Sequence, residues 1–407
     1  MDALILGESP NALSAARSLG RRGLEVMVLA DRVNRALESS RYVSRFELLE
    51  ARGDAEVCAF LLGQPQCAER PFLLATGDRW ALLVAEHQER LKARYRFVCP
   101  SYATLAGIID KAKLYESAKR SGFPCPKFYV VEGKTDIEAA VAAVSTPCFV
   151  KPALAHRWRA IRNSKVERAG TANELRRILA VFVEMGMVAV PQEIIPGDDS
   201  QIFSVAAYID RHGDCVGWRT KRKLRQWPIQ AGDGSLQETC EQPEVADLGL
   251  RLLTTLGHRG PATVEFRRDQ RDGRFVLIEI NARTILGQEM VTRSGFDVPW
   301  TAYCDATDKP VPKPGPPRRV RWIALGPDYR AFRALHKQRA ITIRGWLRSI
   351  ITCNAFAYFA VNDPLPFMIR MLAWCRRRIQ KQSETGSRSS GSRGLRGSRV
   401  ARGRQPE

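Results

Sequence analysis

Three side chains that carry oxygen ligands lie on two segments whose patterns predict a β-hairpin. Glu265 belongs to the first predicted strand, and Glu279 and Asn281 belong to the second. Residues two apart point to one face of a strand, and counting back from a turn near Arg271 brings Glu265 roughly opposite 277–279. Two carboxylates this close would repel each other unless a cation lay between them. Carboxylate and amide oxygens suit Mg²⁺, so the hairpin predicts a magnesium site that also takes substrate phosphates.

Two cationic residues are placed to meet phosphate oxygens beside this hairpin. Arg283 follows Asn281 on the same predicted face, and Lys151 ends the short apolar strand in 147–152. Cations suit such positions because the charge on phosphoryl oxygens has to be neutralised before they can react. Two plainer interpretations stay open: the hairpin face could be solvated, and Lys151 could be a lone surface lysine.

The stretch QEIIPGDD at 192–199 carries polar groups that could recognise a nucleoside. Gln192 and Glu193 flank a predicted strand end, and Asp199 follows a glycine turn. Such groups could contact an adenine edge and ribose hydroxyls. Taken alone, this pattern is not specific.

Two further charged residues are candidates for substrate contacts. Asp78 lies at the carboxyl end of the strand in 71–79, where open α/β sheets place their ligands. Arg225 closes a cationic run at 221–225, ahead of a glycine-rich turn at 232–234. This region could form a mobile loop over a substrate, or it could be a solvated basic hairpin.

The elements that must position these residues alternate between strands and helices. Residues 2–30 predict a strand, an amphipathic helix and a second strand, which is how a parallel α/β sheet begins. The first turn, at 7–12, lacks two glycines of a dinucleotide fingerprint, so bound NAD is not expected. After residue 110 helices mix with hairpins, and residues 311–375 begin with a proline-rich connector and continue as short amphipathic helices. The fold class is therefore α/β.

Composition limits the compartment and the class of protein. The length of 407 residues favours two or three domains. The formal net charge of +21 could belong to a solvated basic tail or indicate contact with an anionic membrane or nucleic acid. Ten scattered cysteines without a CxxC pair argue against a zinc site or a disulfide framework. Because neither a signal-peptide pattern nor a long apolar window is present, we expect a cytoplasmic protein.

The C-terminal end concentrates positive charge. Residues 376–407 hold nine Arg and one Lys against two Glu, and their Ser- and Gly-rich composition predicts a disordered tail. The preceding segment 366–381 has an apolar part followed by three arginines, so it could pack on the body or lie on an anionic membrane. Nucleic acid is a weaker candidate as a binding partner, because the tail has no aromatic residue after Trp374 that could stack on bases.

The order and spacing of the motifs resemble the ATP-grasp superfamily. The most similar group is that of the carboxylate–amine ligase-like proteins, related to D-aspartate ligase and to the grasp domains of the carbamoyl-phosphate-synthase type. The motifs are DK at 110–111, KP at 151–152, QExxPGDD at 192–199, ExxxD at 265–269 and ExNxR at 279–283. SRYVSRF at 40–46 and DPLPF at 363–367 also fit this group, and the resemblance covers roughly residues 1–375.

This resemblance implies an N-terminal open parallel α/β domain, a two-lobed ATP-grasp domain and a helical C-terminal extension. The expected divisions are a pre-ATP-grasp domain at 1–110, a first lobe at 111–187, a second lobe with the metal hairpin at 188–310, the helical extension at 311–375 and the basic tail at 376–407.

The resemblance also assigns a role to each matched residue. Lys111 and Lys151 would hold ATP phosphates; Gln192, Glu193 and Ile195 would line the adenine site; Asp199 would bind ribose; Glu265, Glu279 and Asn281 would ligate one or two Mg²⁺; and Arg283 would contact the transferred phosphoryl group. Arg283 and Lys151 are thus the expected catalytic residues.

The implied activity is ATP-dependent ligation of a small carboxylate or amino acid to an amine, through an acyl phosphate. One segment departs from the family: residues 153–162 contain no glycine where the family carries a glycine-rich loop. Such a segment cannot bring its backbone to phosphate in the same way, so arginines substitute or nucleotide handling differs. The alternative is an ATP-binding regulator or scaffold of the same fold with weak catalysis.

Overall fold

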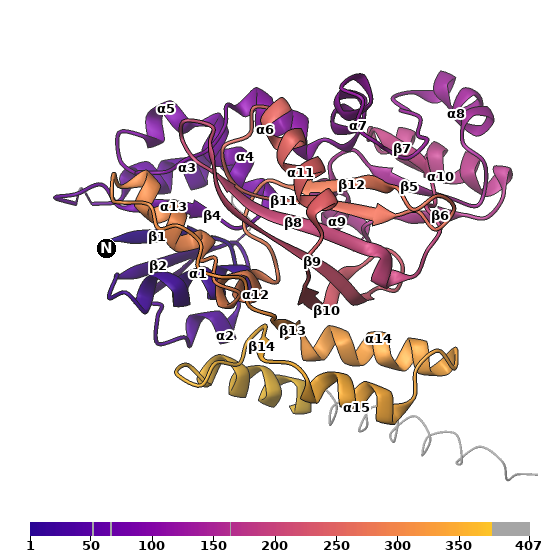
Figure 1. The fold of residues 1–407 in the computed structure, drawn as a ribbon. Coiled ribbons are helices and arrows are strands. Elements are labelled where there is room, and N and C mark those ends of the chain that lie inside the picture. The colour runs from indigo at the N-terminus through magenta and orange to yellow at the C-terminus, as the bar shows by residue number, and fades with distance from the viewer. Residues whose placement is uncertain (51–52, 66, 163, 377–407) are drawn as a thin grey trace, which may run out of the picture.

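The computed structural model describes residues 1–50, 53–65, 67–162 and 164–376, and three β-sheets organise this part of the chain (Figure 1). Among these residues, no helix is both long and apolar enough to cross a membrane. The predicted basic tail lies outside the described residues, apart from Arg376.

A four-stranded parallel sheet forms the N-terminal region, with strand order β3-β2-β1-β4. Its strands are β1 (Ala3–Leu6), β2 (Val26–Ala30), β3 (Arg45–Leu48) and β4 (Phe72–Ala75). Its helices are α1 (Pro10–Gly20), α2 (Arg35–Glu38), α3 (Asp54–Gly63), α4 (Asp78–Glu86), α5 (Gln88–Leu91) and α6 (Tyr102–Ile109). β1 and β2 are buried throughout, as expected for parallel strands covered on both faces, and the predicted strand–helix–strand opening is confirmed.

A small three-stranded antiparallel sheet, ordered β6-β5-β7, forms the next region. Its strands are β5 (Cys148–Pro152), β6 (Glu167–Ala169) and β7 (Ala189–Glu193), and its helical elements are α7 (Lys111–Arg120), η1 (Lys134–Asp136), α8 (Ile137–Ala143), α9 (Ala155–Arg162) and α10 (Ala172–Glu184). Because β7 pairs with β5, this sheet runs past the lobe boundary expected at residue 187.

A seven-stranded sheet, ordered β12-β11-β8-β9-β10-β13-β14, forms the largest region. Its first five strands in the chain are β8 (Ile202–Ile209), β9 (Cys215–Trp227), β10 (Asp233–Thr239), β11 (Gly260–Arg268) and β12 (Phe275–Asn281), accompanied by η2 (Asp199–Gln201), α11 (Pro243–Thr255), α12 (Gln288–Arg293) and α13 (Val298–Ala306). Val205, Val264 and Phe266 face α11 in one apolar core, which leaves the opposite face for polar side chains.

The C-terminal extension contains helices, as expected, together with two short strands. Short strands β13 (Arg321–Ile323) and β14 (Ala355–Phe356) complete the large sheet, because β13 pairs with β10. Helices α14 (Leu325–Lys337) and α15 (Ile343–Ile351) and the helical segment 365–376 lie along the same edge of the molecule (Figure 1).

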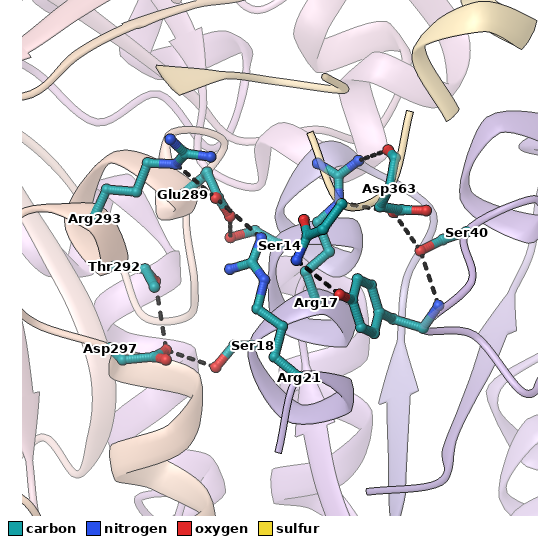
Figure 2. Close-up of polar contacts among 12 residues, drawn as sticks. Ser14, Arg17, Ser18, Arg21, Ser40, Glu289, Thr292, Arg293, Asp297 and Asp363 are labelled. Carbon is teal, nitrogen blue, oxygen red and sulfur yellow. Dashed lines mark hydrogen bonds and ion pairs between the residues drawn. The ribbon is translucent and has the colours of Figure 1, made fainter. Parts of the chain in front are cut away.

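A buried polar cluster ties α1 to the C-terminal extension (Figure 2). The Arg17 guanidinium donates to an Asp363 carboxylate oxygen at 2.9 Å and to the Tyr358 carbonyl at 2.6 Å. Ser40 Oγ donates to the same carboxylate at 2.7 Å. Arg17 and Asp363 are both buried, so this pair fixes the end of the extension to the N-terminal sheet region.

Candidate active site

One row of side chains crosses four strands of the large sheet. Glu279 on β12 is the direct partner of Glu265 on β11, Glu265 pairs with Ser204 on β8, and Ser204 pairs with Lys221 on β9. Cross-strand partners project from the same face of a sheet. The predicted hairpin, with its two carboxylates opposed, is therefore confirmed, and the row continues into a lysine.

Lysines from three different elements surround the two carboxylates. Lys223 Nζ donates to Glu265 Oε1 at 2.7 Å, and both side chains are buried. Lys111, at the start of α7, brings Nζ to 3.7 Å from Glu279 Oε2. Lys165, which follows α9, forms an ion pair with Asp233 at the start of β10.

The titration behaviour of the site reflects this excess of positive charge. Burial of Glu279 acts to raise its pKa, yet the ammonium groups of Lys111, Lys165 and other nearby lysines prevail and hold the pKa well below its usual range. Burial lowers the pKa of Lys151 to about 8, and the charge of Lys111 acts in the same direction. A polyanion entering here would relieve the repulsion among these lysines.

Glu265, Glu279 and Asn281, the three side chains predicted to bind a metal ion, lie together on the hairpin. Asn281 Nδ2 donates to Glu279 Oε1 at 3.3 Å, so the amide and the carboxylate are neighbours. Within the described residues, no three His, Cys, Asp or Glu side chains gather as a metal site. Two carboxylates and an amide fit Mg²⁺, because this ion keeps waters and substrate phosphates as its other ligands.

The residues assigned to adenine lie at the end of β7 and just after it. Gln192 is buried, and its Oε1 accepts a hydrogen bond from the Tyr115 hydroxyl at 3.0 Å. Glu193 Oε1 accepts from the Lys127 amide at 2.8 Å, and Ile195 is buried just after the strand. The chain passes through this segment from the small sheet to the large one.

The residue assigned to ribose lies against the end of β9. Asp199 Oδ1 accepts hydrogen bonds from Gln226 Nε2 at 2.7 Å and from the Gln230 amide at 3.3 Å. Burial raises the pKa of Asp199. Its second carboxylate oxygen is the one that could accept from a ribose hydroxyl.

Arg283 and Asp78, which lie far apart in the sequence, meet in an ion pair. Arg283 Nε lies 2.6 Å from Asp78 Oδ1, and Asp78 is the first residue of α4 at the carboxyl end of β4. Burial acts to lower the pKa of Arg283, but the Asp78 charge outweighs it and raises the pKa. Asp78 thus holds the guanidinium beside the hairpin, a role that the sequence did not indicate.

The cationic run on β9 is not a solvated hairpin, since Lys221, Lys223 and Arg225 are all buried. Lys221 Nζ donates to Gln237 Oε1 at 3.0 Å, and burial lowers its pKa to about 8. Lys221, Lys223 and Arg225 are spaced two residues apart along one strand, and this spacing predicts that they share a face of the sheet.

Arg225 is directed toward the C-terminal extension rather than toward the carboxylate pair. Its guanidinium donates to both carboxylate oxygens of Asp328 on α14, each at 2.9 Å, and to Ser349 Oγ at 2.8 Å. All of these contacts are made by buried or half-buried groups, so the structure gives Arg225 a structural role and offers no support for a substrate contact.

The glycine-free segment 153–162 contains helix α9. Trp158 is buried and stacks on Phe182 with ring centroids 4.1 Å apart, and its indole N–H donates to Ser164 Oγ at 2.9 Å. A helix leaves only the N–H groups of its first turn without an internal partner, so α9 offers its backbone donors to a phosphate at its N-terminus alone, unlike a glycine loop. Lysine side chains such as Lys151 and Lys165 are the alternative source of positive charge.

Known proteins share parts of this sequence and fold, although no protein-family model matches the chain. The D-aspartate ligase of Enterococcus faecium (strain Aus0004) is 26% identical over 247 residues, which cover 57% of this chain and 57% of that enzyme. The match thus spans little more than half the length of that relative.

Two solved structures have the same architecture. N5-carboxyaminoimidazole synthetase from Staphylococcus aureus, complexed with ADP, aligns with a TM-score of 0.58 at 14% identity over 77% of this chain and 78% of its own. The L-amino acid ligase from Bacillus licheniformis aligns with a TM-score of 0.58 at 16% identity over 79% of each chain. The parallel N-terminal sheet, the small sheet and the large sheet of this chain therefore form the same overall fold as these two enzymes.

Proposed function

We propose that the protein is an ATP-dependent carboxylate–amine ligase that forms an amide-type bond on an amino acid or another small carboxylate. The observation that carries this proposal is the opposed pair Glu265 and Glu279 ringed by Lys111, Lys165 and Lys223. A D-aspartate ligase and an L-amino acid ligase are among the similar proteins, which supports the same class of reaction here.

The proposed reaction has two steps and needs no nucleophilic side chain. A substrate carboxylate oxygen attacks the γ-phosphorus of ATP, and ADP leaves. An amine nitrogen then attacks the acyl carbon, and inorganic phosphate leaves. The protein aligns the reactants and neutralises their oxygens, which is the main demand of phosphoryl transfer.

The chain's own residues divide this work. Lys111 and Lys151 bind phosphate oxygens, and the segment Gln192–Ile195 with Asp199 holds the nucleoside. Arg283, oriented by Asp78, faces the transferred group. Glu265, Glu279 and Asn281 would hold one or two Mg²⁺, which when bound neutralise phosphoryl oxygens.

A second candidate is an ATP-binding regulator with little turnover, and the helical α9 in place of a glycine loop favours it. The two candidates differ in ADP release. The test is a screen of amino acids and small carboxylates, paired with amines, for stimulated ADP production in millimolar Mg²⁺. Nucleotide binding without stimulation by any pair would favour the regulator, and stimulation by one pair would establish the ligase.

The compartment, the domain divisions and the partners beyond small molecules also remain proposals. Ten free cysteines favour a reducing compartment such as the cytoplasm. The divisions at residues 110, 187, 310 and 375 follow the family, with the first-lobe sheet extended through β7. Contact with an anionic membrane through the C-terminal end remains the proposed additional partner.

A further inference from the structure

Exposed apolar side chains gather in the C-terminal extension. The structure describes thirteen exposed large apolar side chains, and nine of them lie between residues 343 and 374. We name as the C-terminal face eight of these, on α15 and the helical segment 365–376: Ile343, Leu347, Ile351, Leu365, Met368, Met371, Leu372 and Trp374. Surfaces of this kind on a single protein usually mark a site of interaction.

Helix α15 has apolar side chains on two different sides. Its inner side packs through Trp346, whose ring stacks on Phe332 of α14 with centroids 4.4 Å apart. Its outer side carries Ile343, Leu347 and Ile351 at spacings of four residues, so they form one stripe. Ile351 is 82% exposed, which is far more than packing against the body would leave.

The segment 365–376 lies next to α15 on the same support. Trp374 and Trp346 both contact the ring of Tyr329 on α14, at centroid distances of 6.2 Å and 5.8 Å. Figure 1 shows α15 on the side of α14 that faces away from the large sheet. The two helices therefore form an outer layer, and their apolar side chains belong to one surface.

The charges around this surface have one sign. Residues 311–376 contain twelve Lys and Arg against two Asp, a formal net charge of +10. Both aspartates are buried and turned inward, Asp328 onto Arg225 and Asp363 onto Arg17. The exposed charges of the extension are therefore positive, and Arg344 and Arg348 lie on α15 next to the apolar stripe.

We propose that the C-terminal face binds the surface of a bilayer rich in anionic lipid. An apolar stripe flanked by arginines matches the boundary between acyl chains and negative headgroups, where the stripe is buried and the guanidinium groups meet phosphate. The proposal is independent of the ligase reaction. It extends the membrane contact considered for 366–381 to α15, whose sequence had not suggested it.

Other occupants fit this surface less well. A second copy would bring one +10 extension against another. The chain's own residues 377–407 contain few large apolar side chains and are themselves basic, so they cannot cover the stripe. Nucleic acid would satisfy the arginines but would leave Ile343, Leu347 and Ile351 in water.

Flotation of the full-length protein tests the proposal. The protein is mixed with vesicles of phosphatidylcholine alone or of phosphatidylcholine with phosphatidylglycerol. We expect binding only to the anionic vesicles, and a loss of about tenfold or more in the triple variant Ile343→Ser, Leu347→Ser and Ile351→Ser, because three apolar side chains no longer enter the interface. Replacing Arg344 and Arg348 by Gln should weaken binding as well.

The matched control is Val33→Ser with Tyr102→Ser, two exposed residues of the N-terminal region that should leave flotation unchanged. Unchanged melting temperature and ATP binding will establish that each variant is folded. The proposal is overturned if the wild type does not float with anionic vesicles, or if the triple serine variant floats as the wild type does, since the basic tail alone would then account for binding. It is equally overturned if the stripe supports a dimer or RNA retention instead.

Discussion

Glu265 and Glu279 face each other across β11 and β12, and each has a lysine as its neighbour, Lys223 at 2.7 Å and Lys111 at 3.7 Å. The two lysines come from different regions of the chain, one from the large sheet and one from the first helix of the small-sheet region. The carboxylate pair therefore lies where the small-sheet region meets the large sheet. Nucleotide and Mg²⁺ arriving there would replace lysine contacts with phosphate contacts.

Asp78→Asn should lower kcat while leaving the fold intact. The carboxylate lies 2.6 Å from Arg283 Nε and orients the guanidinium that we propose contacts the transferred phosphoryl group. Loss of an orienting partner of this kind lowers activity by about ten- to a hundredfold. Steady-state kinetics with the substrate pair found in the ligase screen will measure the effect.

The control for this variant is Asp54→Asn, which removes a carboxylate paired with the nearby Arg79 but not with Arg283. Its kcat should match that of the wild type. A raised KM with unchanged kcat in Asp78→Asn would instead assign Asp78 to direct substrate contact.

ATP affinity should fall as the pH rises through 8. The pKa of Lys151 in the free protein is about 8, so its ammonium is present below that pH and lost above it. ATP favours the charged form and should bind more tightly at pH 7 than at alkaline pH. Titration of ATP across this range by calorimetry will measure the dependence.

Lys151→Arg is the comparison, because a guanidinium keeps its charge throughout this range. The variant should have a flatter pH profile, with some dependence left because the pKa of Lys221 is also about 8. Equal profiles for the variant and the wild type would show that Lys151 does not bind phosphate.

Arg225→Ala should destabilise the protein strongly. The substitution leaves the buried Asp328 carboxylate without its bidentate partner, and breaking a buried pair in this way costs roughly 3–5 kcal/mol. Urea unfolding will measure the loss. Arg333→Ala, at an exposed position on the same helix as Asp328, should change stability by no more than about 0.5 kcal/mol. Wild-type stability together with a raised KM for Arg225→Ala would restore this residue as a substrate contact.

The sequence predicted the parts of the site that depend on local periodicity. Alternation along the hairpin places Glu279 and Asn281 on one face, and counting from the turn brings Glu265 opposite Glu279, as observed. Strand β5 with Lys151 near its end follows from the same kind of pattern. These features depend on residues that are close in the chain and on a short turn, so the sequence contains enough information to predict them.

The rest of the site depends on contacts between distant segments. Nothing near Asp78 in the sequence reveals its pairing with Arg283, and nothing near Arg225 reveals α14. A lysine-rich strand is also more often solvated than buried, so the composition of β9 does not predict that Lys221 and Lys223 are buried. In α15 apolar residues lie on both sides, and only packing shows which side is left exposed.

The measurement that tests the central claim most directly is Mg²⁺-dependent ADP production by the wild type and by Glu279→Gln. The substitution keeps the size of the side chain and removes the charge that would hold the metal. Our account predicts that the wild type releases ADP when a suitable carboxylate and amine are present, and that Glu279→Gln, although folded, falls to background. Normal ATP consumption by Glu279→Gln would contradict it.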